Sequence, residues 1–98
     1  MALMQLTLTM TGSNVQASST SQPCKFVRVE NEAGNAIVKY GTSLLSATVY
    51  AGSVLADTAT INNGVIIGPF SGEAPMDLTN LYFLGTDGQE IHLTVVTH

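Results

Sequence analysis

Charged side chains are scarce in this sequence, and so are the residue types that build chemical sites. The 98 residues include three basic and seven acidic side chains, two histidines, one cysteine and no tryptophan. Active sites gather titratable or metal-ligating groups in clusters. This shortage argues against a catalytic centre, so we expect a protein that is not an enzyme, holds no cofactor or metal, and works through its surface.

Basic residues are the scarcer charged class, and two of the three, Lys25 and Arg28, share one short segment. The formal net charge is −4, whereas nucleic-acid binding needs a basic stripe that neutralises phosphates. No run approaches the roughly 18 uninterrupted apolar residues that a membrane-spanning helix needs. We therefore expect neither nucleic acid nor a membrane as a partner.

The first residues and the single cysteine bear on where the chain folds. No basic cluster precedes the apolar positions near the N-terminus, and threonines interrupt them, so no secretory leader is expected. Cys24 has no second cysteine to pair with, which suits folding in a reducing cytoplasm. Its neighbours Pro23 and Lys25 offer no activating histidine, and this favours a buried, inert thiol.

Hydrophobic alternation with a period of two predicts strands in place of helices. Threonines separate Leu6, Leu8 and Met10, which is typical of a half-buried strand. Residues 12–22 are dominated by Ser, Thr, Asn and Gln and are expected to form a loop or arm. Such an arm is long enough to let the first strand reach away from its own domain.

Further strands are expected at residues 24–30, 36–40, 46–50, 54–56, 65–67, 78–84 and 90–96. A short helix is the alternative for part of residues 42–56. Residues 31–35 and the Asp87-Gly88 pair predict hairpin turns, and residues 65–67 a buried core strand. Ile91, Leu93 and Val95 are expected to face inward and Val96 outward, while Val27 and Val29 share one side of their strand.

These patterns predict a single all-β domain over residues 1–98, in which residues 1–22 form an N-terminal strand plus a polar arm. The expected fold is a small antiparallel β-sandwich or jelly-roll-like barrel of about seven or eight short strands.

Individual polar residues have ordinary explanations. His92 falls on the outward face of the last strand and is expected to be a solvated surface residue. Glu73, Asp77 and Asp87 are expected in loops, where carboxylates suit calcium, but they do not form the alternating acidic ladder of a dedicated site. No nucleophile elbow supports a Ser-His-Asp centre.

The stretch from Met76 to Ile91, preceded by Ile66-Ile67-Gly68-Pro69-Phe70, resembles the C-terminal halves of small structural proteins from the head modules of tailed bacteriophages. In that family an Asp-Leu-x-x-Leu-Tyr-hydrophobic-x-Gly run, followed by a Gly-containing turn, ends a compact β-domain. Residues 77–85 read Asp-Leu-Thr-Asn-Leu-Tyr-Phe-Leu-Gly. The threonine-striped first strand and the polar arm have no counterpart in the family pattern.

The resemblance implies a virion protein on the capsid exterior, made in the host cytoplasm: a capsid decoration or cement protein. Its partner would be the major capsid protein, whose capsomer seams it would stabilise, and no catalytic residues carry over. The alternative is a fibre or tail accessory module that recognises a host glycan through stacking on Tyr40, Tyr50 and Tyr82.

Self-association is expected from the first strand and its arm. Exchange of that strand between identical chains would bury Leu6, Leu8 and Met10 and satisfy edge hydrogen bonds, so these three are the predicted oligomer contact. A homotrimer is the expected state, because cement proteins commonly sit between capsomers at threefold positions.

Overall fold

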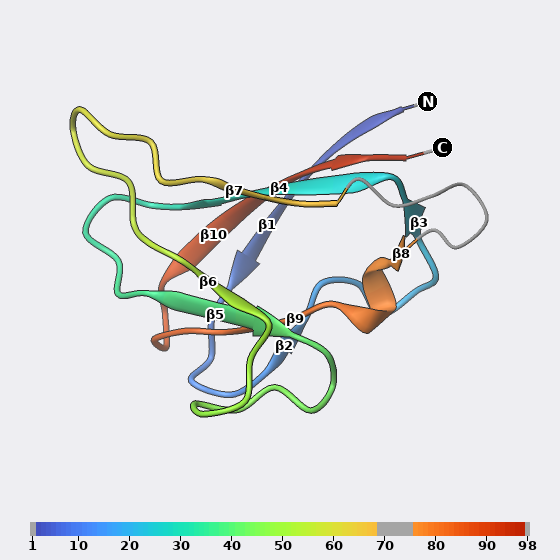
Figure 1. Cartoon of the computed structure of the whole chain (residues 1–98), viewed down its shortest axis with the longest axis horizontal. Helices are drawn as coiled ribbons and strands as arrows, with labels where there is room; N and C mark the ends of the chain where they lie inside the picture. The colour runs from blue at the N-terminus through green and yellow to red at the C-terminus, as the bar shows by residue number, and fades with distance from the viewer. Residues whose placement is uncertain (1, 69–75, 98) are drawn as a thin grey trace.

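The computed structural model describes residues 2–68 and 76–97, and it confirms the all-β sandwich (Figure 1). The described residues contain ten short strands and one 3₁₀ helix. These are β1 (Leu3–Thr9), β2 (Val15–Gln16), β3 (Pro23–Cys24), β4 (Phe26–Asn31), β5 (Val38–Gly41), β6 (Gly52–Val54), β7 (Val65–Ile67), β8 (Met76–Asp77), η1 (Leu78–Asn80), β9 (Tyr82–Leu84) and β10 (Glu90–Val96).

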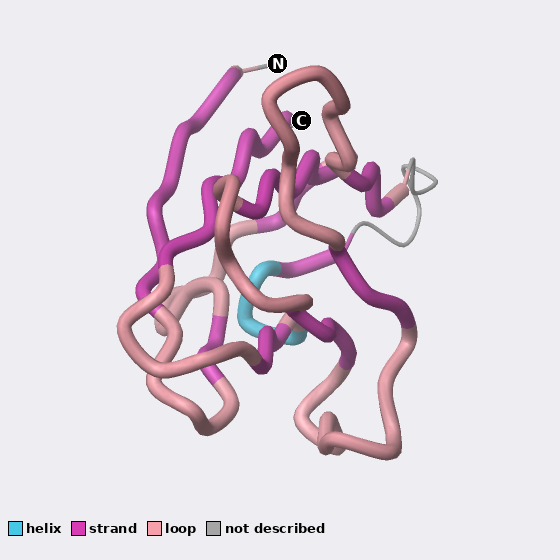
Figure 2. The backbone as a smooth tube through the Cα atoms, turned by 90° about the vertical axis from the view of Figure 1, so that its left-hand side faces the viewer, coloured by secondary structure: helices cyan, strands magenta, loops and turns pink. Residues whose placement is uncertain are grey.

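Two four-stranded antiparallel sheets form the two layers. Sheet A has the order β1-β10-β4-β7 and sheet B the order β2-β9-β5-β6, while β3 and β8 form a separate two-stranded pair. Figure 1 shows sheet A above sheet B, and Figure 2, turned by 90°, shows β1 along one margin of the molecule. The strands that pair are mostly far apart in sequence, as in β1 with β10.

The core lies between the inner faces of the two sheets. Val27 and Val29 of β4 and Ile91, Leu93 and Val95 of β10 are all buried, as their alternation predicts. Phe83 of sheet B is fully buried opposite them and is the largest such side chain. Val96 has the predicted outward register on β10, opposite Leu3 and Phe26, but it is buried, at 7% exposed.

Both predicted hairpins are wrong, because each turn carries the chain from one sheet to the other. β4 belongs to sheet A and β5 to sheet B, and β9 and β10 are divided in the same way. The buried Asn31 explains the first crossing: its Nδ2 donates to the carbonyls of Ala36 (2.9 Å) and Val54 (3.1 Å). Asn35 Nδ2 in turn donates to Asn31 Oδ1 (2.9 Å), so side chains fix the path here.

Three predicted strands differ from those observed, and local side-chain hydrogen bonds account for two of the differences. Residues 46–50 form a loop, in which Ser46 Oγ accepts from the backbone N–H groups of Thr48 and Val49. The strand expected at 54–56 ends at Val54, and the one expected at 78–84 begins as η1, which Asp77 caps.

The strand expected at 65–67 exists as β7, but it is an edge strand and is not fully buried. Ile66 is 59% exposed, while Val65 and Ile67 pack against the core. Apolar runs are ambiguous in this respect, because their pattern does not distinguish a central strand from an edge strand. No helix among the described residues is long and apolar enough to cross a membrane.

The polar segment 12–22 lies against its own domain and does not project from it. β2 pairs with β9, and the Ala17 N–H donates to the Leu81 carbonyl (2.8 Å). Gln16 Nε2 donates to the Thr79 carbonyl and Asn14 Nδ2 to the Leu45 carbonyl, both at 2.8 Å. The polar side chains thus bind backbone groups of neighbouring segments, a role that composition alone does not reveal.

Candidate interaction surface

The outer face of sheet A forms a regular surface across four paired strands. Outward positions of neighbouring strands lie opposite one another, so they form rows across the sheet. From one end to the other, the rows are Leu3, Val96 and Phe26; then Gln5, Thr94, Arg28 and Ile66; then Thr7, His92 and Glu30; and finally Thr9 and Glu90. The face is therefore apolar at one end, mixed and mainly polar in the middle, and acidic at the other end.

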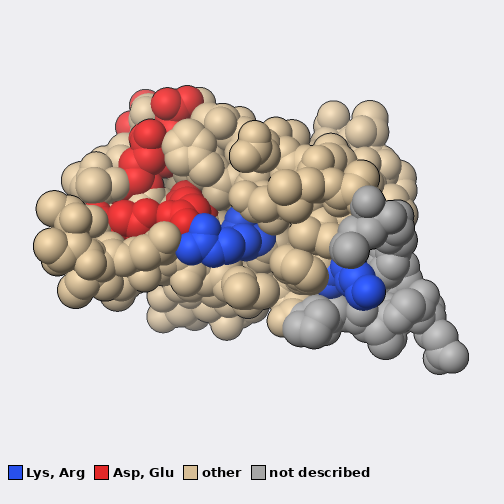
Figure 3. All heavy atoms as spheres, turned by 90° about the horizontal axis from the view of Figure 1, so that it is seen from above, with Lys and Arg blue, Asp and Glu red and all other residues tan. Residues whose placement is uncertain are grey.

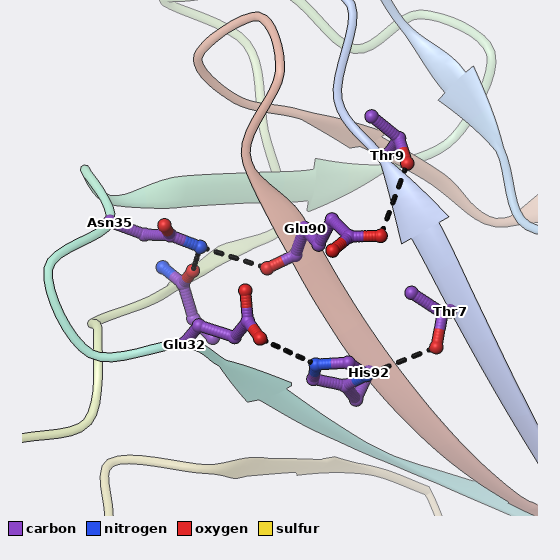
Figure 4. Close-up of polar contacts among 7 residues, drawn as sticks. Thr7, Thr9, Glu32, Asn35, Glu90 and His92 are labelled. Atoms are coloured by element: carbon purple, nitrogen blue, oxygen red, sulfur yellow. Dashed lines mark hydrogen bonds and ion pairs between the residues drawn. The ribbon is translucent and has the colours of Figure 1, made fainter.

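His92 joins three segments across the outer face (Figure 4). The Thr7 hydroxyl lies 3.1 Å from Nδ1, and Glu32 Oε1 lies 3.1 Å from Nε2. The network is open to water, since the His92 and Glu32 side chains are 45% and 46% exposed. His92 is thus a surface residue, as predicted, but its contacts with Thr7 and Glu32, which come from distant segments, were not predictable from the sequence.

The arrangement of a hydroxyl, an imidazole and a carboxylate has the order of groups found in a catalytic triad. Catalysis by such a triad also needs donors aimed at a developing oxyanion. The Thr7 hydroxyl and the His92 ring lie on a flat sheet face, where they bond to each other and the ring also bonds to Glu32. The contacts therefore describe a cross-strand brace between β1, β10 and the end of β4.

Acidic side chains gather at one end of the outer face, with basic side chains beside and beyond them (Figure 3). Arg28 forms an ion pair with Glu30, and Asn62 Nδ2 donates to Glu30 Oε1 (3.1 Å). A side-chain hydrogen bond with Glu30, and another from the Asn63 N–H (2.7 Å), hold the pKa of Asp57 below its ordinary value. The positive charge of Arg28 acts in the same direction.

Asp77 has a structural role. Its carboxylate accepts hydrogen bonds from the Ser21 hydroxyl (2.5 Å), the Gln22 N–H (3.0 Å) and the Thr79 N–H (3.0 Å). The Thr79 hydroxyl (2.9 Å) adds a fourth. These bonds lower the pKa of Asp77, so its contribution to stability is present above the ordinary carboxyl pKa and is lost as the pH falls through the lowered value.

Asp87 and Cys24 also have structural explanations. Asp87 occupies the turn before Gly88, whereas Glu73 lies outside the described residues. Cys24 is a free, buried thiol; burial raises its pKa, and the charge of Asp77 raises it further. A thiol of this kind is poorly reactive. Across the described part of the chain, no group of three or more His, Cys, Asp or Glu side chains is placed to hold a metal ion.

The three tyrosines do not form one stacking platform. Tyr40 packs against the core from the inner face of sheet B, whereas Tyr82 is adjacent in sequence to the buried Phe83 and so faces outward. Tyr50 lies in the loop after β5, where Lys39 Nζ stands 4.6 Å from the centre of its ring. Only Tyr50 is among the exposed large hydrophobic residues, at 49%.

The loop that follows β5 contains an apolar hollow that the sequence did not reveal. It has a volume of about 190 Å³ and is lined by Gly41, Thr42, Leu44, Leu45, Val49, Tyr50 and Ala51. Leu44 and Val49 are 78% and 58% exposed. None of the residues that line the hollow is charged. The hollow therefore suits contact with an apolar side chain better than catalysis.

The residues predicted as an oligomer contact lie within the chain's own sandwich. Met10 is fully buried in the core, and Leu6 and Leu8 are half-buried against it. β1 pairs along its whole length with β10 of the same chain. The homotrimer itself stays a prediction.

Comparisons with known proteins add no identity to this geometry. No protein-family model matches the chain, and neither a curated protein nor a solved structure matches it. The likeness of residues 66–70 and 76–91 to phage head proteins thus remains a resemblance carried by those residues. What the chain does is inferred below from its surfaces.

Proposed function

We propose that this chain is a capsid decoration or cement protein of a tailed bacteriophage, which binds the outside of the shell and stabilises the seams between capsomers. The observation that carries the proposal is the outer face of sheet A, a four-stranded face on which mixed polar side chains, among them the exposed Thr7 and the half-buried Thr94, stand between an apolar end and an acidic end. A surface with chemically distinct ends docks a protein partner in one orientation.

Three further features support this role. Polar groups of the outer face bind one another, as in the contacts of Thr7 with His92 and of Arg28 with Glu30, so docking there would bury paired groups and not isolated charges. The net charge of −4 suits the outer side of a shell better than the side facing DNA. Many equivalent copies on a symmetric shell also turn weak single contacts into strong attachment.

The proposed partner is the major capsid protein, and the proposed location is the capsid exterior after synthesis in the host cytoplasm. Attachment through the outer face would leave sheet B and its loop toward solvent. This orientation gives the proposal a specific test, because equivalent substitutions on the two faces should differ in effect.

The test uses purified particles of the virus whose genome encodes the chain, stripped of this protein and mixed with the recombinant form. Thr94→Lys places a charge in the middle of the outer face of sheet A, whereas Ser53→Lys places the same charge on the outer face of sheet B. We expect co-sedimentation to weaken by about tenfold or more for Thr94→Lys, since burying an unpaired charge at an interface is costly. Ser53→Lys should bind as the parent chain does.

Electron cryo-microscopy of the re-decorated particles should place density for this fold over capsomer seams. Absence of the protein from particles, or equal binding by both lysine variants, would overturn the proposal.

A further inference from the structure

We propose that the open edge of β1 is a self-association surface, on which a second copy of this chain pairs its own β1 in antiparallel orientation. The two copies of sheet A then form one continuous sheet about a twofold axis. The inference rests on the geometry of one strand and does not depend on the proposed capsid role.

The hydrogen bonds of β1 define which backbone groups are free to pair. The Met10 N–H donates to the Gln89 carbonyl (2.7 Å), and the Thr97 N–H donates to the Ala2 carbonyl (2.9 Å), so even-numbered residues bond toward β10. Successive residues of a strand direct their backbone groups to opposite sides. The N–H and C=O groups of Leu3, Gln5, Thr7 and Thr9 therefore face the open margin that Figure 2 shows.

β1 differs from the other outer strands of the two sheets in length and in protection. It has seven residues, against two in β2 and three each in β6 and β7. Its sequence, Leu-Met-Gln-Leu-Thr-Leu-Thr, contains no charge, proline or glycine. Natural edge strands usually carry such residues, or are short, because an unprotected edge pairs with another chain.

The side chains on the inner side of β1 indicate that the strand pairing with its open edge is β1 of a second copy of this chain. Met4, Leu6 and Leu8 pack against the core but remain only half-buried, so each keeps apolar surface near the edge. In an antiparallel pair centred on Leu6, Leu6 faces its own counterpart and Met4 faces Leu8 of the other copy. One contact thus covers the remaining apolar surface of all three residues in both copies.

The same register also satisfies the free backbone groups. Leu3 pairs with Thr9 of the other copy and Gln5 with Thr7, so every residue whose N–H and C=O face the margin gains a partner. Registers centred elsewhere leave at least one of these residues unpaired. The self-complementary sequence of β1 therefore favours this one alignment.

Electrostatics do not oppose the pairing, although each copy has a net charge of −4. β1 is uncharged, and the nearest carboxylate on the outer face belongs to Glu90, which lies opposite Thr9. From strand spacing and rise, the two Glu90 positions of the pair lie roughly 25 Å apart, beyond the Debye length of about 8 Å at physiological salt. A twofold contact also closes on itself, so it predicts a dimer in place of the expected trimer.

Backbone hydrogen exchange on the wild-type chain tests the pairing directly. At a concentration where light scattering reports a dimer, the amides of Leu3, Gln5, Thr7 and Thr9 should be protected, and on dilution to the monomer they should exchange freely. The amides of Met4, Leu6 and Leu8 should stay protected in both states, because they bond to β10. A chain that stays monomeric near millimolar concentration would overturn the proposal. A dimer in which the amides of Leu3, Gln5, Thr7 and Thr9 exchange freely would also overturn it, and that result is expected if the copies exchange their first strands.

Two pairs of variants test the edge and the register. Gln5→Pro removes an outward N–H that β10 does not use, and should weaken dimerisation by about tenfold or more, whereas Gln5→Thr keeps the N–H and should dimerise as the wild type does. A folded Gln5→Pro variant that dimerises as tightly as the wild type contradicts the proposal.

Leu6→Cys should form a disulfide between copies under mild oxidation, because facing residues of a non-hydrogen-bonded pair lie about 4.5 Å apart at Cα. Leu8→Cys faces Met4 and should crosslink much less. Equal crosslinking of the two variants would contradict the register centred on Leu6.

Discussion

Sheets A and B bury the same core but treat their outer faces differently. In sheet A, β1 and β10 have seven residues and β4 has six, and their outward side chains form the open rows of the interaction surface. In sheet B the longest strand, β5, has four residues, and the following loop folds back over it. Lys39 Nζ donates to the Ala47 carbonyl (2.6 Å), and Leu45 Cδ1 lies 3.5 Å from where a Gly41 Cβ would stand.

This difference teaches which part of the chain is free to bind. A face that its own loops cover has already used its contacts, whereas a bare, regular face keeps them for a partner. The strand lengths follow from the sequence: threonine alternates with apolar residues through β1, whereas glycine and serine interrupt the segments of sheet B. The sheet with the longer strands is the one on which both proposals rest.

The strongest test of the shared core is Phe83→Ala in sheet B. Phe83 is 0% exposed, and its removal should lower the free energy of unfolding by about 3–5 kcal/mol, a large part of the usual 5–15 kcal/mol. Urea unfolding followed by circular dichroism measures the loss. The neighbouring, half-buried Leu84→Ala is the matched control and should cost less. Two separate transitions would show that the sheets unfold independently, which would contradict a core shared by sheets A and B.

Asn31→Ala removes the buried side chain that guides the crossing from sheet A to sheet B. The Ala36 and Val54 carbonyls lose their donor, and Asn35 loses its acceptor. Leaving buried polar groups unpaired should lower the free energy of unfolding by about 2–3 kcal/mol. Asn35→Ala, which removes a more exposed member of the network, should cost less, and urea unfolding followed by circular dichroism measures both losses. Equal losses for the two variants would show that burial at Asn31 is not the decisive factor.

The sequence predicted those parts of the fold that local pattern determines. The inward sets of β4 and β10 follow from strict alternation, and the positive φ of Gly88 (+84°) agrees with turn chemistry. The sheet partner of each strand was not predictable, because β4 and β5 are separated by a turn-like segment whose path depends on the long-range hydrogen bonds of Asn31. Turn residues show that the chain reverses, not which sheet it joins.

The candidate surface was predictable to a smaller degree. Threonine stripes and an outward His92 indicated an exposed face, and the apolar side of the first strand indicated a contact between copies. The meeting of His92 with Glu32, 60 positions away, was not predictable because nothing local encodes it. The role of β1 as an edge was likewise hidden, since an edge strand is defined by the side that lacks a neighbour.

Gly88→Val tests the crossing from sheet B back to sheet A. Gly88 has a φ of +84°, and the space around it is open, so the cost comes from backbone strain and not from a clash. We expect a loss of about 1–2 kcal/mol in the free energy of unfolding, whereas Gly88→Asn, which tolerates positive φ better, should lose less. Chemical denaturation measures both. Equal stability of the valine variant and the parent would indicate that the turn adopts another conformation.

The smallest effect is expected from His92→Ala on the bare face of sheet A. Its contacts with Thr7 and Glu32 have hydrogen-bond distances of 3.1 Å each. Both contacts are exposed to solvent, where such a pair contributes about 0–1 kcal/mol to stability. A double-mutant cycle with Glu32→Ala isolates the pair, because each single variant removes the contact between His92 and Glu32. We expect a coupling energy below about 1 kcal/mol at low salt, falling further as salt is added. A coupling that is larger, or that does not respond to salt, would mean that this network is shielded from solvent and that the outer face of sheet A is not bare in solution, as it would be if a second copy or another partner covered it.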